Sequence, residues 1–320
     1  MRLLRPLLSF VLAVSAAGAF AQDYPSRPVK LIAPTAPGTG TDATARFLAD
    51  RLSKEWNQGV VVENKVGANG ILGADFVAKS PADGYTLLMG LSALYVNKSL
   101  YKSLPFDPIK DFRVLAGVND LYLALVVPAN SPFQTVKDLV DAASARPGKV
   151  SYGSAGSGST THLGPALLGS MANVQLLHVP YKGGAQAITD TISGQVDFAM
   201  TAVATAAPQI QSGRLRALAV SGTQRTKSLP NVPSLTEAGY KGYNVTSKTF
   251  LAAPAGTPDA VAEKINAAVT KIVRSPEYQK FLEAQGFEAE TLSPVAYQQQ
   301  AAKEVAHWAE IVRISGAKAD

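Results

Sequence analysis

Short apolar strands and amphipathic helices alternate along almost the whole of this chain, and this alternation limits the possible folds more than any other feature. A strand is predicted at Val29–Ala33, and the segment 42–56 after it repeats its apolar side chains near the 3.6-residue helical period. Strands predicted at 60–63 and 86–89 have the apolar character of strands buried on both faces, and a helix is predicted between them at 71–79. Repeated strand–helix units form a parallel or mixed sheet with helices on its faces, so we expect an α/β protein.

The same alternation fills the middle of the chain, and helices dominate its last quarter. The chain has 320 residues, enough for two domains with a core each, but it contains no long flexible linker. Two lobes must therefore be joined by structured crossings, for which the strands predicted at 121–127 and 245–253 are the candidates. We expect residues 22–123 and 247–320 to form lobe 1 and residues 124–246 to form lobe 2.

The N-terminus has the pattern of a secretory signal. Arg2 and Arg5 precede an almost wholly apolar stretch at 7–14, and Ala19-Phe20-Ala21 supplies the small residues of a cleavage site. The apolar stretch is too short to span the roughly 30 Å of membrane hydrocarbon. We expect residues 1–21 to be a cleaved signal peptide.

Composition narrows the compartment and the partner. The chain has no Cys, so it has neither a disulfide nor a cysteine for a lipid anchor, and we expect it free in the periplasm. Its 30 Lys and Arg residues exceed its 24 Asp and Glu residues only mildly, and the excess is scattered. That balance suits a small anion better than a nucleic acid, which requires a concentrated basic face.

Two turns rich in Gly, Ser and Thr are the strongest functional candidates. One lies at 37–42 and the other at 153–162, and each follows a predicted strand and opens a predicted helix. A helix N-terminus has free N–H groups and a partial positive charge, so it attracts anions. Glycine permits close approach of a ligand, and hydroxyl groups add donors. The same residues would serve equally well in two ordinary loops that only cap their helices.

Familiar catalytic motifs are incomplete at specific positions. Neither turn has the Lys of a phosphate-binding loop, and Ala43 stands where a dinucleotide fingerprint needs its third Gly. The segment 90–94 ends in Leu instead of the final Gly of a nucleophile elbow. The three histidines, His162, His178 and His307, are far apart in sequence. We therefore expect no catalytic residue, no metal and no cofactor; a hydrolase would need a histidine beside a serine of the second turn.

Two further candidates lie near predicted strand ends. The loop that contains Tyr181 and Lys182 follows a strand and precedes a helix, which is where open α/β sheets bind ligands. Tyr95 follows the strand that ends near Gly90, so its ring is placed either to stack on a ligand or to pack in the core.

Around these turns the sequence resembles the substrate-binding proteins of tripartite tricarboxylate transporters, also called the Bug family. The resemblance extends from Tyr24 to Gly316 and depends on seven stretches taken in order. They are YPSRPVKLIAPTAPGTGTD (24–42), VVVENKVGANGILGADFVAKSPADGYTLL (60–88), YGSAGSGSTTHL (152–163), HVPYKGG (178–184), GQVDF (194–198), GRLRALAVSGTQR (213–225) and APAGTPD (253–259).

The resemblance implies a type II periplasmic-binding-protein fold with two α/β lobes and a ligand cleft between them. It implies that the turns at 35–42 and 154–162 hold a ligand carboxylate through backbone groups, hydroxyls and water. It also implies delivery of the ligand to one large and one small permease subunit in the membrane. We expect a monomer that contacts these subunits transiently.

The chain departs from the family pattern where Thr201 and Ala202 replace an acidic or amide pair and where Lys248 replaces an aromatic residue. The first change removes a partner for an ammonium group, and the second offers a cation to a second carboxylate. These changes favour a dicarboxylate over an amino acid, unless Lys248 points into solvent.

The turns and the resemblance together predict the ligand-binding residues Thr35, Ala36, Gly38, Thr39, Gly40, Asp42, Ser92, Tyr95, Ser154, Ala155, Gly156, Ser157, Thr160, Thr161, His162, Tyr181, Lys182, Thr201, Ala202 and Lys248. The predicted function is capture of a small carboxylate, with di- or tricarboxylates favoured, for a tripartite tricarboxylate transporter. An orphan or sensory binding protein that presents its ligand to a receptor is the alternative, and a periplasmic hydrolase is a more distant one.

Overall fold

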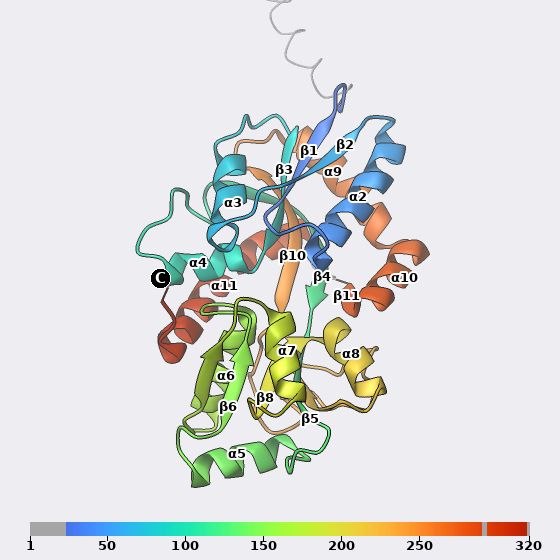
Figure 1. Ribbon diagram of the computed structural model, residues 1–320. Coiled ribbons are helices and arrows are strands. Elements are labelled where there is room, and N and C mark those ends of the chain that lie inside the picture. Colours follow the sequence, from blue (N-terminus) through green and yellow to red (C-terminus); the bar gives the residue numbers. More distant parts are fainter. Residues whose placement is uncertain (1–23, 290–292, 319–320) are drawn as a thin grey trace, which may run out of the picture.

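The chain folds into two α/β lobes, each built on its own sheet (Figure 1). The structure is a computed structural model that describes residues 24–289 and 293–318. The predicted signal peptide, 1–21, lies outside the described residues.

The first sheet has six strands in the order β11-β4-β10-β3-β1-β2. Strands β1, β2 and β3 are parallel, whereas β10 is antiparallel to both β3 and β4, so the sheet is mixed. The strand bounds are β1 Val29–Ala33, β2 Val60–Asn64, β3 Thr86–Leu91, β4 Phe112–Leu121, β10 Ser247–Pro254 and β11 Phe287–Ala289.

The second sheet has five strands in the order β7-β6-β8-β5-β9. Strands β7, β6 and β8 are parallel, and β5 is antiparallel to both of its neighbours. The strand bounds are β5 Leu123–Pro128, β6 Ser151–Ser154, β7 Leu177–Pro180, β8 Phe198–Ala202 and β9 Leu215–Val220.

Helices cover both faces of the first sheet. Helices α2 (Gly40–Trp56) and α9 (Asp259–Val273) contribute apolar side chains to one core, together with α10 (Pro276–Gln285). The opposite face is covered by α3 (Ile71–Ala78), α4 (Ala93–Leu100) and α11 (Pro294–Ser315), with the short helix η1 (Ala68–Gly70) ahead of α3. In lobe 2, α5 (Val136–Ala145) and α6 (Thr160–Met171) lie in one core, and α7 (Gly184–Ile192) and α8 (Val203–Gln211) supply the other.

The predicted strand at 121–127 is in fact a junction. β4 ends at Leu121 in the first sheet and β5 begins at Leu123 in the second, so the chain crosses between the lobes at Tyr122. The return crossing precedes β10, because Val245 still bonds Ser221 of lobe 2 whereas Ser247 pairs with Leu121 of β4.

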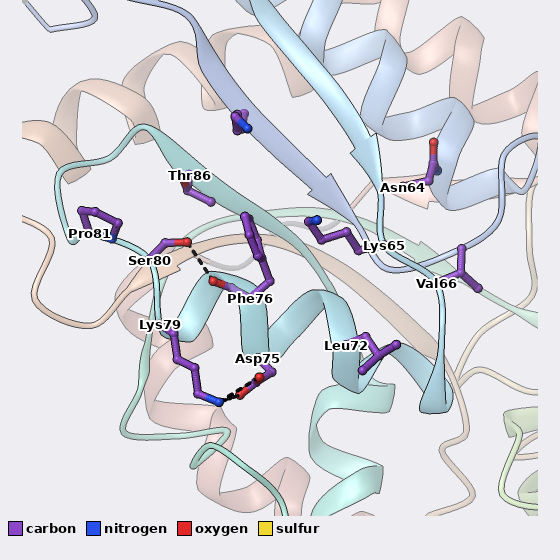
Figure 2. A pocket seen from close by; sticks show the side chains of 11 residues that line it. Asn64, Lys65, Val66, Leu72, Asp75, Phe76, Lys79, Ser80, Pro81 and Thr86 are labelled. Atoms are coloured by element: carbon purple, nitrogen blue, oxygen red, sulfur yellow. Dashed lines mark hydrogen bonds and ion pairs between the residues drawn. The ribbon is translucent and has the colours of Figure 1, made fainter.

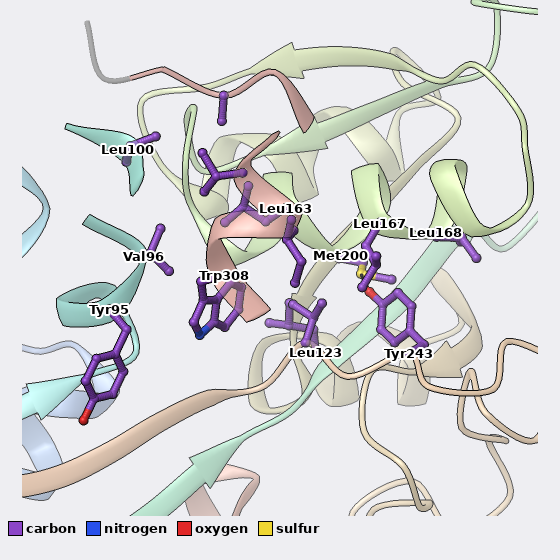
Figure 3. Packing of buried hydrophobic residues seen from close by; sticks show 14 of the residues in the cluster. Tyr95, Val96, Leu100, Leu123, Leu163, Leu167, Leu168, Met200, Tyr243 and Trp308 are labelled. Atoms are coloured by element: carbon purple, nitrogen blue, oxygen red, sulfur yellow. Dashed lines mark hydrogen bonds between the residues drawn. The ribbon is translucent and has the colours of Figure 1, made fainter. Parts of the chain in front are cut away.

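A third connection was not predicted. Helix α11 packs on α4 of lobe 1 and on α6 of lobe 2. Figure 3 shows the Trp308 indole between Val96 of α4 and Leu163 of α6, and Trp308 is 1% exposed. One continuous apolar cluster therefore extends from the first sheet into lobe 2, beside the two strand crossings.

Two other predictions needed correction. β2 was expected to be buried on both faces, but it is the edge strand of its sheet, and Val61 is 51% exposed. Strand β4 and helices α4 and α8 were missed. Polar residues such as Arg113 and Asn119 interrupt β4, and only tertiary contacts, for example those from Asn119 to Thr44 and Tyr278, make them compatible with a buried strand.

Candidate functional site

The first turn joins the carboxyl end of β1 to helix α2. Thr39 is the N-cap, and its hydroxyl group accepts from the backbone N–H of Asp42 at 3.3 Å. The same hydroxyl lies 2.9 Å from both the Thr35 hydroxyl and the Ala36 carbonyl. The N–H group of Gly40 lies in the first turn of α2, where no carbonyl of the same helix is in reach.

Asp42 holds this turn together from inside. Its carboxylate accepts from the Gly38 N–H at 2.9 Å, from Asn64 Nδ2 at 2.8 Å and from Arg46 Nε at 3.0 Å. These interactions lower the pKa of Asp42 to about 2, although desolvation acts in the opposite direction. The hydrogen bond from Arg46 is the largest cause, and those from Asn64 and Gly38 add to it. Because its carboxylate is committed to its own loop, the structure places Asp42 as a support of the turn, beneath the exposed residues 36–39.

The second turn joins β6 to α6 and is capped in the same way. Ser159 is the N-cap, and its hydroxyl accepts from His162 N and donates to the Gly156 carbonyl at 2.7 Å. The Thr161 hydroxyl accepts from Ala155 N at 2.9 Å and lies 2.8 Å from the Ser159 hydroxyl. Thr161 therefore braces the turn, while the Ser157 side chain at its tip is exposed.

Histidines lie directly behind this turn. His162 Nδ1 accepts from the Gly158 N–H at 3.1 Å, and the His178 Nε2 atom lies 2.6 Å from Ser154 Oγ. The two imidazole rings stack at 3.8 Å between centroids and 3° between planes. The distant hydrolase hypothesis required a serine–histidine contact of this kind, but Ser154 is 0% exposed, so its hydroxyl supports the turn and has no access for a substrate.

Two more helices begin at the same edge of the second sheet. β6, β7 and β8 are parallel, so α6, α7 and α8 all start from carboxyl ends that lie together. The N-caps of α7 and α8 are Gly183 and Ala202, and neither makes a side-chain capping hydrogen bond. The first-turn N–H groups of α7 have no acceptor within that helix, whereas in α8 the Val203 N–H donates to the Tyr122 carbonyl at 3.0 Å and Gly286 packs against Ala204.

Close contacts locate these turns relative to lobe 1. A Cβ atom at Gly158 would lie 2.5 Å from Leu100 Cδ2, so the second turn touches the end of α4. Gly184 at the start of α7 lies against Ala155 of the second turn. The segment Gly286-Phe287 makes a second contact between the lobes. Phe287 packs against Gly40 of the first turn, and Gly286 packs against Ala204 in the first turn of α8.

Ser92 and Tyr95 have structural roles. The Ser92 hydroxyl accepts from Lys248 N at 2.9 Å and joins the end of β3 to β10. Tyr95 is 1% exposed and stacks on Phe250 with 5.7 Å between ring centroids, and burial raises its pKa. The structure thus places the Tyr95 ring in the core, the second of the two options that the sequence left open.

The Lys248 side chain is mostly buried and pairs with a carboxylate of its own sheet. Its ammonium group is 3.5 Å from the Asp120 carboxylate across β10 and β4, and both side chains are 14% exposed. It also lies 5.9 Å from the centre of the Tyr297 ring. A second ligand carboxylate at this position would have to compete with Asp120 for the same cation. Thr201 is buried at the carboxyl end of β8, beside Ala202.

The remaining predicted residues are accessible. Tyr181 and Lys182 lie between β7 and α7, where Tyr181 is half-buried and Lys182 is exposed. Desolvation, followed by a hydrogen bond with Asp190, raises the pKa of Tyr181. Thr160 at the start of α6 is half-buried. The second turn and the Tyr181 loop are adjacent, because Gly156 lies against the Tyr181 carbonyl.

A hollow of about 880 Å³ lies elsewhere, on the outer edge of lobe 1 (Figure 2). It is bounded by Lys30 of β1 and by helix α3, and the Lys65 ammonium lies 4.1 Å from the centre of the Phe76 ring. Leu72, 56% exposed, lies at its rim. This hollow contains none of the predicted ligand-binding residues.

Sequence reasoning missed four residues that shape the turns: Arg46, Asn64, Ser159 and His178. Ser159 was within reach, because a serine three residues before His162 at the start of a helix is a capping signal. Arg46 was also within reach, because it stands four residues after Asp42 on α2, the spacing of a helical ion pair. Asn64 and His178 act across space. Asn64 lies at the end of β2, and β2 is brought beside the first turn only by pairing with β1.

The chain has two α/β lobes joined by paired strand crossings, and helix N-termini gather at the carboxyl edge of its parallel strands. These features define the class of periplasmic solute-binding proteins. Comparisons agree with this class. The periplasmic binding protein BugD is 33% identical with a TM-score of 0.77, over 92% of this chain and 99% of that one. In Rhodopseudomonas palustris, Rpa4515 with adipate is 33% identical with a TM-score of 0.81, over 92% and 99%. MatC from the same organism, with bound malate, is 28% identical with a TM-score of 0.77, over 90% and 100%.

The family model described as the tripartite tricarboxylate transporter family receptor, TctC, matches residues 44–316. The chain belongs to this family. It is a solute receptor of a transporter and not an enzyme. Within residues 24–289 and 293–318, no helix combines the length and apolar character needed to cross a membrane.

Proposed function

We propose that this receptor binds a small dicarboxylate between its lobes in the periplasm and delivers it to the membrane subunits of a tripartite tricarboxylate transporter. The observation that carries the proposal is the gathering of the α6, α7 and α8 N-termini at one edge of the lobe 2 sheet. Partial positive charge at these ends favours an anion, and the first-turn N–H groups of α6 and α7 have no acceptor within their own helices. The relatives bound to adipate and malate support the choice of a dicarboxylate.

The first carboxylate is assigned to the second turn. The N–H groups of Thr160 and Thr161 belong to the first turn of α6 and have no acceptor within that helix. Ser157 adds an exposed hydroxyl at the tip of the same turn. The lobe 1 side of the site is assigned to the exposed residues 36–39 of the first turn. Their backbone groups would supply the contact, because the Thr39 hydroxyl already caps α2. Asp42 and Thr161 hold the two turns in shape.

The second carboxylate is assigned to the start of α7. Gly183 leaves this helix without a side-chain cap, and Lys182 immediately before it is exposed. Lys182 therefore replaces Lys248 in the proposal, because the Lys248 ammonium is paired with Asp120. An exposed ion pair is worth about 1 kcal/mol at most, or roughly fivefold in affinity.

The decisive experiment compares adipate with hexanoate, which lacks the second carboxylate, by calorimetry. Lys182→Met is expected to weaken adipate binding by roughly threefold to fivefold and to leave hexanoate binding unchanged. Lys241→Met is the matched control, since Lys241 is also exposed in lobe 2 but lies in another loop. Lys248→Met is expected to lower stability while keeping the preference for the diacid.

An unchanged diacid preference in Lys182→Met removes Lys182 as the second anchor, and a lost preference in Lys248→Met restores Lys248. Mass spectrometry of small molecules released from freshly purified protein tests the substrate class directly. Recovery of a compound without a carboxylate group would contradict the proposed function.

A further inference from the structure

A stack of three rings packs against the second turn. His162 of α6 and His178 of β7 lie face to face at 3.8 Å, and Tyr152 of β6 lies 5.0 Å from His178 with 24° between the ring planes. His162 is 4% exposed, and His178 is half-buried. The rings are part of the wall of a hollow of about 830 Å³ between α6 and the C-terminal end of α11.

Both imidazoles act as hydrogen-bond acceptors toward the turn. The Gly158 N–H donates to His162 Nδ1 at 3.1 Å, so this nitrogen has no proton and Nε2 carries the hydrogen. Ser154 Oγ accepts from the Gly156 N–H at 3.1 Å, and its hydroxyl hydrogen has two acceptors in reach, His178 Nε2 at 2.6 Å and the Gly156 carbonyl at 3.4 Å. The shorter contact favours His178 Nε2 as the acceptor. In this arrangement His178 carries its hydrogen on Nδ1.

Protonation reverses these roles. An imidazolium donates from both nitrogens, so protonated His162 would present an N–H to the Gly158 N–H. Protonated His178 would donate to Ser154 Oγ, and the Ser154 hydroxyl would have to turn its hydrogen from His178 toward the Gly156 carbonyl. Gly156 and Gly158, at φ 117° and 77°, form the part of the turn between these bonds. Loss of the Gly158–His162 bond, together with reversal of the Ser154–His178 bond, would release the loop whose shape presents Ser157 and the first turn of α6.

We propose that His162 and His178 are positioning residues which hold the second turn in its ligand-accepting shape only as neutral imidazoles, so that acid weakens ligand binding. The proposal rests on the assignment of this turn to a ligand carboxylate.

The surroundings favour the neutral forms. Burial, followed by the charge of His178, lowers the pKa of His162 to about 4, and burial lowers that of His178. The charged side chains that line the hollow are Arg313 and Lys318, both on the C-terminal side of α11. Glu310 is engaged with Arg313 at 2.6 Å, Tyr152 is neutral because burial raises its pKa, and the neighbour from α4 is the apolar Leu100.

The test compares the wild type with acceptor-preserving variants that do not titrate. Asn at 162 places Oδ1 near the position of Nδ1, and Gln at 178 places Oε1 near the position of Nε2. Adipate affinity is measured by calorimetry from pH 7 to pH 4 for the wild type and for the His162→Asn, His178→Gln double variant. The protonation of adipate itself affects both proteins equally, so the ratio of the two affinities isolates the histidines.

We expect the double variant to bind within about twofold of the wild type at pH 7. Below pH 5 the adipate affinity of the wild type is expected to fall relative to that of the double variant, by roughly twofold or more at pH 4. His162→Leu, which removes the acceptor, is expected to bind about threefold to tenfold more weakly at pH 7. His307→Gln is the control, since His307 bonds the Asn244 carbonyl on the exposed face of α11.

Identical pH profiles for the wild type and the double variant would overturn the proposal, as would full affinity in His162→Leu. A readout without ligand separates this proposal from the proposed function. Nitrogen NMR of the free protein at pH 7 should show the Nε2–H tautomer for His162 and the Nδ1–H tautomer for His178. The opposite tautomers refute the positioning mechanism, whereas the expected tautomers together with no binding of any carboxylate refute only the proposed function.

Discussion

Asp42 gives the sharpest test of how the first turn is built. Its side chain is 3% exposed and accepts three hydrogen bonds, from Gly38, Asn64 and Arg46. Replacement by Asn keeps the shape but turns one of two acceptor atoms into a donor. That donor then faces the donor group of Asn64 or those of Gly38 and Arg46.

The magnitude follows from the pKa of Asp42, which falls from 3.8 to about 2 in the folded protein. This difference corresponds to about 2 kcal/mol in favour of the ionised carboxylate. The carboxylate is covered by its own turn but lies close to solvent, and screening reduces the contribution to about 1–2 kcal/mol. We expect Asp42→Asn to lower the free energy of unfolding by this amount at pH 7 and to weaken carboxylate binding.

The sign of the pH dependence is fixed by the lowered pKa. The stabilisation is fully present above pH 3.8 and is lost as the pH falls toward 2, because the unfolded state takes up its proton first. Urea unfolding of both proteins at pH 7 and pH 3 measures the effect, and roughly half of the pH-dependent difference should remain at pH 3.

Asp50→Asn is the matched control on the same helix. Asp50 is 53% exposed and pairs with Lys54 and Arg51, so its replacement should leave the unfolding midpoint nearly unchanged. An equal loss in both variants, or a difference for Asp42→Asn that does not change between pH 7 and pH 3, would show that the carboxylate does not hold the turn.

Two further predictions concern contacts between the lobes. Trp308→Ala should lower the free energy of unfolding by about 3–5 kcal/mol, because the buried indole fills the space between α4 and α6. Val295→Ala, at a 67% exposed position of the same helix, is the control and should change the free energy of unfolding little. Similar losses in the two variants, measured by calorimetry, would contradict the bridging role of α11. Gly158→Ala should destabilise more than Gly213→Ala, since both have positive φ (77° and 69°) but only the former places a Cβ atom 2.5 Å from Leu100 Cδ2. In a protein that also carries Leu100→Ala, the additional destabilisation by Gly158→Ala should disappear. Equal melting temperatures for the two glycine variants would show that the turn does not press against α4.

Much of the architecture was predictable because it depends on local patterns. The alternation of apolar strands with helices predicted two α/β lobes. The predicted bounds of β1 agree with the structure, and α2 ends at the predicted residue 56 but begins at Gly40 instead of 42. The resemblance identified the family, which the match over residues 44–316 shows. Strand β4 was not predicted because Arg113 and Asn119 interrupt its apolar pattern. Their polar groups have hydrogen-bond partners only in the folded protein.

The candidate site divides in the same way. Sequence alone located both turns, since Gly, Ser and Thr between a strand and a helix are readable from neighbouring residues. It also left Tyr95 and Lys248 undecided, because the direction of a side chain depends on the strand or helix that packs beside it. Pairing of β10 with β4 joined Lys248 to Asp120, and the packing of Phe250 took Tyr95 into the core.

The sequence by itself thus determined the class of fold, the family and the two turns, because these follow from short-range periodicity and from the order of motifs. Only the tertiary structure decided how the turns are supported. Asn64 lies 22 residues from Asp42, and His178 lies 24 residues from Ser154. Both pairs meet through the pairing of parallel strands, and no local pattern specifies which distant side chains such a pairing brings together.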